Sequence, residues 1–268
     1  RKESSAASDV YKRQEFSSAT SIGLTLYKEV KRQMLESLAS SEWAPGDAIP
    51  SEKLLCQRFG VSIGTLRKAI DELVAENLLI RHQGRGTFVA LHNRGPHLFR
   101  FFNVVRHDGQ KSYPQLTLNS FSKTKTDDFA SEKLGIPNGS AAFQFVNVRS
   151  LNDEPVLVDE ITLPAALFPG LTKTQLRDRP STLYNLYQVS FGINVIRIEE
   201  RVRASLASAA HAELLNIATG APLLKIHRVA FSYNNQPIEF RTSYVNTEHY
   251  EYFPSVCLLY TSPSPRDS

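Results

Sequence analysis

Residues 50–89 read PSEKLLCQRFGVSIGTLRKAIDELVAENLLIRHQGRGTFV, and this stretch predicts two short helices followed by a β-hairpin. Ser51 is placed to cap a helix over residues 52–58, because a serine hydroxyl before a helical run accepts a hydrogen bond from a free backbone N–H. Gly60 can adopt the positive φ of a tight turn. Ser62 is placed to cap a second helix directly after that turn.

The second helix is predicted to have one apolar and one polar face. Its apolar face contains Leu66, Ala69, Ile70, Leu73 and Asn77, and its opposite face contains Ile63, Gly64, Arg67 and Lys68. The first face is suited to packing, which leaves the second exposed.

The hairpin is predicted from two β-prone runs, Leu78–His82 and Thr87–Ala90, joined by Gln83-Gly84-Arg85-Gly86. The two glycines allow a close backbone turn, and Arg85 projects from its tip. Two helices joined by a short turn and followed by a hairpin form a winged helix-turn-helix, the geometry that inserts one helix into a DNA groove.

This part of the sequence resembles the GntR family of bacterial transcription regulators. The resemblance covers residues 24–90 and is carried by Leu26-Tyr27, Pro45-Gly46-Asp47, Pro50-Ser51-Glu52, Val61-Ser62, Thr65-Leu66-Arg67 and Gly84 to Val89. It implies that Lys53, Ser62, Thr65, Arg67 and Lys68 contact the major groove or its phosphates, and that Gln83, Gly84 and Arg85 contact the minor groove. The family usually has a base-reading arginine where this chain has Ile63, so the operator sequence is not transferable.

Composition is typical of a globular protein with two domains: 268 residues, 41% hydrophobic and 22% charged. No apolar run approaches the roughly 20 residues that cross a bilayer, so we expect no membrane association. Two cysteines, Cys56 and Cys257, give no disulfide framework, which fits a reducing cytoplasm.

Both ends of the chain resemble translated sequencing-library adapters, at Ser4–Gln14 and Cys257–Asp267. We therefore exclude residues 1–14 and 257–268 from the fold, which leaves 26 basic and 24 acidic residues, a net charge of +2. The body is predicted to divide into a winged helix-turn-helix domain at 15–91, a linker at 92–98 and an effector-binding domain at 99–256.

The second domain contains an internal repeat. Leu134-Gly-Ile-Pro-Asn-Gly139 and Asn152-Asp-Glu-Pro155 recur as Leu215-Asn-Ile-Ala-Thr-Gly220 and Asn234-Asn-Gln-Pro237. Each copy is predicted to be a helix, a strand, a turn and a strand. Two copies predict a pseudo-symmetric antiparallel sheet and are too few for a solenoid.

This half resembles the effector-binding domain of the HutC branch of the same family, called UTRA, whose fold is related to chorismate lyase. The resemblance covers residues 99–253 and is carried by Leu134-Gly135-Ile136, Val148-Arg149, Asn152-Asp153, Pro155, Leu163-Pro164, Phe168-Pro169-Gly170, Ser181 to Tyr184 and Glu239 to Tyr250. It implies an α+β protein, with an N-terminal winged helix-turn-helix and a C-terminal chorismate-lyase-like antiparallel sheet. Asn147 stands where sugar-phosphate-sensing relatives have an arginine.

From what this resemblance implies, together with the charges of the residues, we expect seven residues to contact a small polar or anionic effector. Arg149 can hold a carboxylate with two hydrogen bonds, the repeat places Asp159 opposite Arg241, and Thr182 lies near a helix N-terminus, which attracts negative charge. The charged members can alternatively be solvated strand residues or a local ion pair, and Tyr184 can belong to the core. The seven are Arg149, Asp159, Thr182, Tyr184, Glu239, Arg241 and Tyr244.

The sequence therefore predicts a ligand-responsive transcriptional repressor that binds operator DNA as a homodimer and is released by its effector. No catalytic residues, cofactor or metal site are expected. One alternative is an enzyme of chorismate-lyase-like fold fused to a DNA-binding domain, and adjacent Asp159 and Glu160 do not support it, because neighbouring strand residues face opposite sides. Another is an architectural DNA-binding protein without an effector.

Overall fold

The computed structural model describes residues 26–91, 101–108 and 114–253. The two adapter-like segments, at 1–14 and 257–268, lie outside the described residues, as does the predicted linker at 92–98. The described chain forms two compact units, of which the first contains residues 26–91 together with 183–197 and 231–236. Sequence analysis had assigned those last two segments to the second domain.

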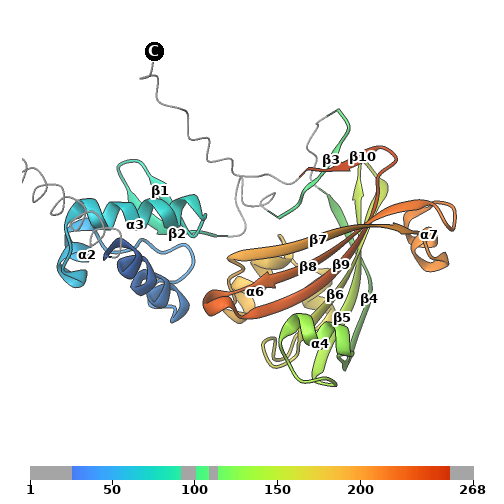
Figure 1. Ribbon diagram of the computed structural model, residues 1–268, viewed down its shortest axis with the longest axis horizontal. Coiled ribbons are helices and arrows are strands. Elements are labelled where there is room, and N and C mark those ends of the chain that lie inside the picture. Colours follow the sequence, from blue (N-terminus) through green and yellow to red (C-terminus); the bar gives the residue numbers. More distant parts are fainter. Residues whose placement is uncertain (1–25, 92–100, 109–113, 254–268) are drawn as a thin grey trace, which may run out of the picture. The chain divides into compact units, whose positions relative to one another are not determined.

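The N-terminal part of the first unit is a winged helix-turn-helix. A helix at residues 26–39 precedes α2 (Glu52–Phe59) and α3 (Ile63–Ala75), and a two-stranded antiparallel hairpin of β1 (Leu79–His82) and β2 (Gly86–Val89) follows. Figure 1 shows these elements in blue to cyan. The element order is the one that the sequence predicts.

Local chemistry explains where α2 and α3 begin and end. The Ser51 hydroxyl accepts a hydrogen bond from the Leu54 N–H, and the Ser62 hydroxyl accepts one from the Thr65 N–H. Gly60 has φ +64°, a left-handed conformation that glycine adopts without a Cβ penalty. These two caps and the glycine fix the turn between the helices.

The core of this part consists of one face from each helix. Leu66, Ala69, Ile70 and Leu73 of α3 are buried together with Leu55 of α2. The prediction for Asn77 was wrong, because α3 ends at Ala75 and Asn77 is exposed with φ +55°. Asparagine tolerates this left-handed conformation, so here it ends the helical region instead of packing.

The second unit is built on a six-stranded sheet. Its strands, in spatial order, are β4 (Gln115–Lys125), β5 (Ala141–Leu151), β6 (Glu154–Pro164), β9 (Pro237–Asn246), β8 (Pro222–Phe231) and β7 (Arg197–Leu206). A separate antiparallel pair consists of β3 (Val104–Arg106) and β10 (Tyr250–Tyr252). The helices of this unit are α4 (Asp128–Leu134), α5 (Lys173–Arg177) and α7 (Ala209–Leu215). The helix α6 (Leu183–Phe191) and a short 3-10 helix, η2 (Tyr233–Asn235), belong to the two later segments of the first unit.

The spatial order confirms the pseudo-symmetric sheet. β4-α4-β5-β6 and β7-α7-β8-β9 are the two copies, and they meet where β6 pairs antiparallel with β9. The matched positions have matched conformations: Gly135 and Asn216 end α4 and α7 in the left-handed region, and Asn152 and Asn234 both have positive φ in the turns. The motifs repeat because each copy needs the same backbone geometry.

Each helix of the repeat packs on a strand of the other copy. Ala130 and Leu134 of α4 lie against Phe240 of β9. Ala212 and Leu215 of α7 lie in a cluster that contains Val158 of β6. The two helices lie at different ends of the sheet (Figure 1). Because each helix packs on a strand of the other copy, neither copy buries its apolar surface alone.

Candidate functional site

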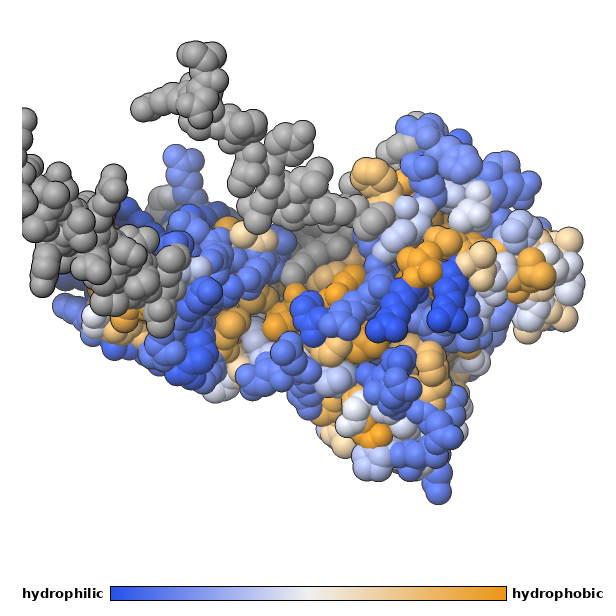
Figure 2. All heavy atoms as spheres, in the orientation of Figure 1, coloured by the Kyte–Doolittle hydropathy of each residue, from blue (hydrophilic) through white to orange (hydrophobic). Residues whose placement is uncertain are grey.

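The α3 helix and the hairpin present an exposed polar surface. Ser62, Arg67 and Lys68 of α3 are exposed, and Thr65 is half-buried because its hydroxyl lies 3.0 Å from that of Ser62. Lys53, at the start of α2, is exposed as well. Hydrophilic residues predominate over this part of the chain on the face drawn in Figure 2.

Arg67, on this surface, has an acidic partner within the protein. Its Nη2 lies 2.8 Å from Oε2 of Glu52, and its side chain is 56% exposed. An exposed pair of this kind contributes little to stability. A DNA phosphate or base can therefore replace Glu52 at low cost.

Ile63 lies beside Arg67 at the N-terminal end of α3 and is 50% exposed. Ile63 belongs to no hydrophobic cluster of the described residues, so packing does not explain why an isoleucine is exposed at this position. Its side chain can contact a thymine methyl group but offers no hydrogen bond to guanine. The base preference at this position therefore differs from that of an arginine.

The tip of the wing is open. Gln83, Gly84 and Arg85 are all exposed, and the Arg85 guanidinium carbon lies 5.9 Å from the centre of the Phe88 ring. Gly84 has φ +70° and Gly86 φ +108°, and a Cβ on either would meet no described atom within 4 Å. Backbone conformation rather than crowding requires glycine at both positions, and the bare backbone can approach a nucleic-acid groove closely.

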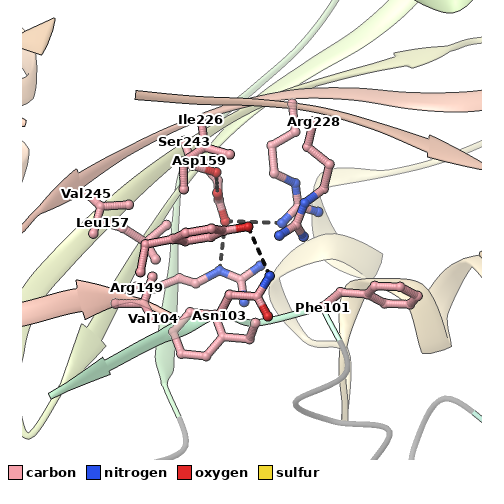
Figure 3. Close-up of a pocket in the computed structure, with 13 residues that line it drawn as sticks. Phe101, Asn103, Val104, Arg149, Leu157, Asp159, Ile226, Arg228, Ser243 and Val245 are labelled. Carbon is pink, nitrogen blue, oxygen red and sulfur yellow. Dashed lines mark hydrogen bonds and ion pairs between the residues drawn. The ribbon is translucent and has the colours of Figure 1, made fainter. Parts of the chain in front are cut away.

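The second unit contains a pocket on one face of the sheet, where charged side chains converge. Asp159 on β6 is 1% exposed and receives Arg149 Nε at 2.7 Å and Arg241 Nη1 at 3.3 Å. The Ser243 hydroxyl donates to the same carboxylate. Figure 3 shows Arg149 and Arg228 directed toward the middle of this pocket from different strands.

Asp159 is ionised at neutral pH. Burial raises the pKa of its carboxyl group, but the charges of Arg149 and Arg241 and the Ser243 hydrogen bond outweigh burial and lower the pKa to about 2. A buried carboxylate with these partners is stable, whereas Arg149 without Asp159 would be an uncompensated charge. The cluster therefore holds its groups in fixed positions.

Two further acids complete the cluster. Glu239, which is fully buried, lies 2.8 Å from Arg241 Nη2. Glu200 accepts from Arg228 Nε at 2.7 Å and also from the Tyr252 hydroxyl. Burial, and then the hydrogen bond to Glu200, raise the pKa of Tyr252 to about 12, so its hydroxyl remains a donor.

The wall of the pocket includes the residues just after the predicted linker. The Phe102 ring lies 5.4 Å from the Arg149 guanidinium carbon, and Asn103 Nδ2 donates to the Tyr252 hydroxyl at 3.1 Å. The remaining cavity is about 20 Å³, room for about one water molecule. This space is too small for a metabolite in the conformation described.

Asn147 is the unusual residue of this face. Its side chain is fully buried on β5 opposite Asp159, and neither atom of its amide has a hydrogen-bond partner among the described residues. An unpaired buried amide costs about 1–3 kcal/mol, so such groups are normally satisfied by water or a ligand.

The structure brings together four of the seven predicted effector residues, namely Arg149, Asp159, Glu239 and Arg241. Thr182 and Tyr184 do not line the pocket, and Tyr184 is buried with its ring 5.8 Å from that of Tyr187. Glu239 contributes through its contact with Arg241 and does not line the pocket either.

Tyr244 lies apart from the other predicted effector residues of the sheet. It faces the other side of the sheet, where its ring lies 3.8 Å from that of His211. It follows Arg241 by three positions, and strand side chains alternate, so the two must face opposite sides. Tyr244 lines a separate hollow of about 470 Å³ together with Glu160, Thr162 and His227.

Sequence reasoning missed Asn103, Glu200, Arg228, Ser243 and Tyr252. The sequence pointed to two of these. Ser243 lies two positions after Arg241 on the same strand and therefore faces the same side of the sheet, and the internal repeat aligns Arg228 with Asn147. Glu200 and Tyr252 come from distant segments, and no local pattern identifies them.

Two general findings limit the chemistry of the described residues. They contain no group of three or more His, Cys, Asp or Glu side chains arranged to hold a metal ion. None of the described helices is both long and apolar enough to cross a membrane.

Comparison with known proteins agrees with both units. The model of bacterial regulatory proteins of the gntR family matches residues 26–89, and the UTRA domain model matches residues 109–251. A fructoselysine utilization operon transcriptional repressor of Escherichia coli K12 is 31% identical over 218 residues, 80% of this chain and 87% of that protein. A histidine utilization repressor of Klebsiella aerogenes is 32% identical over 77% of this chain and 84% of its own length.

A solved structure agrees at the level of the fold. The ligand-binding domain of a GntR-family transcriptional regulator from Bordetella bronchiseptica has 27% sequence identity and a TM-score of 0.54, covering 57% of this chain and 95% of that one. The chain therefore belongs to the GntR family of bacterial transcription regulators, in its HutC branch with a UTRA domain, and is a ligand-responsive, DNA-binding transcriptional repressor.

Proposed function

We propose that this repressor binds DNA as a homodimer whose two winged helices occupy the two halves of an operator. One recognition helix reads only a few base pairs, so two copies are needed for specificity. The observation that supports this most is the exposed set on α3 and the wing tip, which includes Arg67 and Arg85. We also propose a cytoplasmic location, because a bacterial transcription regulator acts where the chromosome lies.

In this proposal each DNA contact has a stated role. Ser62, Thr65 and Arg67 meet base edges or phosphates of the major groove, while Lys53 and Lys68 meet phosphates. Gln83, Gly84 and Arg85 enter the minor groove. On binding, Arg67 exchanges its carboxylate partner Glu52 for DNA.

The pocket around Arg149 is the proposed effector site. Arg149, Asp159 and Arg241 face it and Glu239 positions Arg241. The larger hollow at Tyr244 is a better fit to a metabolite by volume, but the Arg149 pocket has the converging charges, and the unpaired Asn147 amide lies on the strand next to its Asp159. Those groups decide in its favour.

Effector binding is proposed to act through Phe102. This residue covers Arg149 and lies four positions after the predicted linker. A ligand that displaces Phe102 therefore also moves the segment that connects, in sequence, to the winged helix. The two winged helices then change their spacing and no longer fit the operator, which is a shift between two populated states.

We also propose that the second unit senses its ligand without transforming it. The support for this is that relatives of the chain are named repressors. Mass spectrometry of any stabilising ligand after incubation tests this directly. A changed mass would favour the enzyme alternative.

The experiment for the whole proposal is release of DNA. Duplexes selected from a random pool with the purified chain would define the operator, and fluorescence anisotropy would follow binding while fractionated cell extract is added. We expect nanomolar-range binding at moderate salt and a fraction that releases the DNA. Failure to bind any duplex at low salt would rule out the proposal.

A further inference from the structure

We propose that the effector of the Arg149 pocket is net-neutral at physiological pH: a metabolite with one carboxylate balanced by an ammonium group and with hydroxyl or amide groups, and not a phosphate ester. This inference depends on the proposed function, because it names the ligand class of the same site. It follows from how the charges in the pocket are paired.

Every arginine of the pocket already has a carboxylate. Arg149 is paired with Asp159, Arg241 with Glu239 and Asp159, and Arg228 with Glu200. Three positive and three negative groups therefore cancel. A dianion entering this space would have to displace a buried carboxylate from its arginine, which leaves that carboxylate uncompensated.

Arg149 still has room for one monoanion. Its Nε holds Asp159, and its two terminal nitrogens make no hydrogen bond within the described part of the chain. These nitrogens lie in one plane and suit the two oxygens of a carboxylate. The side chain is 16% exposed, so the free end is accessible once Phe102 moves.

A carboxylate at Arg149 would make the pocket negative unless the ligand also brings a cation. Asp159 lines this space and Glu200 contacts the lining residues Arg228 and Tyr252, so these two acids are placed to receive an ammonium group. A zwitterion therefore preserves the balance that the protein has on its own, whereas a phosphate ester does not.

Asn147 indicates which polar groups such a ligand needs beside its charges. It lies on β5 opposite Asp159 and does not itself line the pocket, and its buried amide offers both a donor and an acceptor, which are both unpaired. A phosphate group alone has oxygen acceptors and would satisfy only the Nδ2 donor. A hydroxyl or amide group satisfies both atoms of Asn147, directly or through one water molecule.

The test compares inorganic phosphate with zwitterions on the full chain, by thermal shift and isothermal titration at constant ionic strength. Serine and glutamine are paired with O-phosphoserine and glucose 6-phosphate. We expect no saturable phosphate binding by the wild type and Arg149-dependent stabilisation by at least one zwitterion. Wild type stabilised only by the dianions, or by none of the zwitterions, would overturn the proposal.

Two charge variants make the test independent of the natural ligand. Asp159→Asn and Glu200→Gln each give the pocket one net positive charge, so phosphate should bind at least about tenfold tighter than to the wild type. Glu200→Gln keeps the test valid if Asp159→Asn fails to fold. No gain of phosphate affinity in any folded variant overturns the charge argument.

The proposed function is judged separately. A phosphate ester that releases operator DNA from the wild type in an Arg149-dependent way would contradict the net-neutral class while supporting the repressor. Release by no extract fraction at all would contradict the repressor mechanism instead.

Discussion

At the scale of single residues, Arg67 is the side chain whose role is most directly testable. Arg67→Ala should weaken binding to the selected operator by about 1–3 kcal/mol if it makes a specific base contact. Anisotropy titration measures this, and circular dichroism confirms that the fold is retained. Lys173→Ala is the matched control, since it removes an exposed positive charge from α5 in the second unit.

A substitution at Glu52 tests the same contact in a second way. Because Glu52 holds Arg67 in the free protein, Glu52→Gln should tighten DNA binding modestly, or leave it unchanged if the pair breaks at no cost. Unchanged operator affinity in Arg67→Ala, with either result for Glu52→Gln, would contradict the docking of α3.

The two faces of the sheet lead to a paired prediction for the effector response. Arg149→Ala should abolish release of operator DNA by the active extract fraction, because it removes the free guanidinium end that binds the carboxylate. Tyr244→Phe should leave release intact, since Tyr244 lies on the opposite face. The measurement is the concentration of the fraction that releases half of the DNA. A loss of response in Tyr244→Phe with a normal Arg149→Ala would move the effector site to the larger hollow.

At the scale of elements, the repeated helix ends predict how substitutions behave. Gly135 ends α4 with φ +63°, and Asn216 ends α7 at the matching position with φ +54°. Gly135→Asn should therefore cost little, whereas Gly135→Val should cost about 1–2 kcal/mol because a branched side chain is strained there. Urea denaturation of both variants measures the difference in free energy of unfolding. Equal losses would show that the left-handed backbone is not what requires glycine.

The winged helix shows why local sequence was a good guide to these elements. Serine caps, a glycine turn and a period of 3.6 residues each specify α2 and α3 within a few positions. The error at Asn77 came from continuing the helical period past its end, because the structure ends α3 two residues earlier.

At the scale of the whole molecule, the buried ion cluster predicts a dependence of stability on acid. The pKa of Asp159 is lowered to about 2 in the folded chain, below the ordinary value of 3.8. A lowered pKa means that its stabilisation is present above about pH 4 and is lost as the pH falls toward 2. Asp159→Asn should therefore flatten the acid limb of a plot of unfolding free energy against pH. An unchanged acid limb would show that the cluster does not determine this dependence.

The proposed homodimer predicts a geometric requirement on DNA. An operator with two half-sites on one face of the duplex should bind far more tightly than a single half-site, and insertion of half a helical turn, about five base pairs, should abolish the gain. Light scattering gives the mass of the free protein and of the complex. One monomer bound equally well to single and double half-sites would exclude the dimer.

The sequence by itself determined the winged helix-turn-helix, the two-copy sheet and the family, because caps, glycines and periodicity act over a few residues. The sequence also shows that Arg241 and Tyr244 face opposite sides of the sheet, because side chains alternate along a strand. Only the tertiary structure decided which charges meet: Arg228 with Glu200, Asp159 with two arginines, and Phe102 over Arg149. These partners are far apart in the chain, and pairing across a sheet depends on register and strand order, which no local pattern of residues specifies.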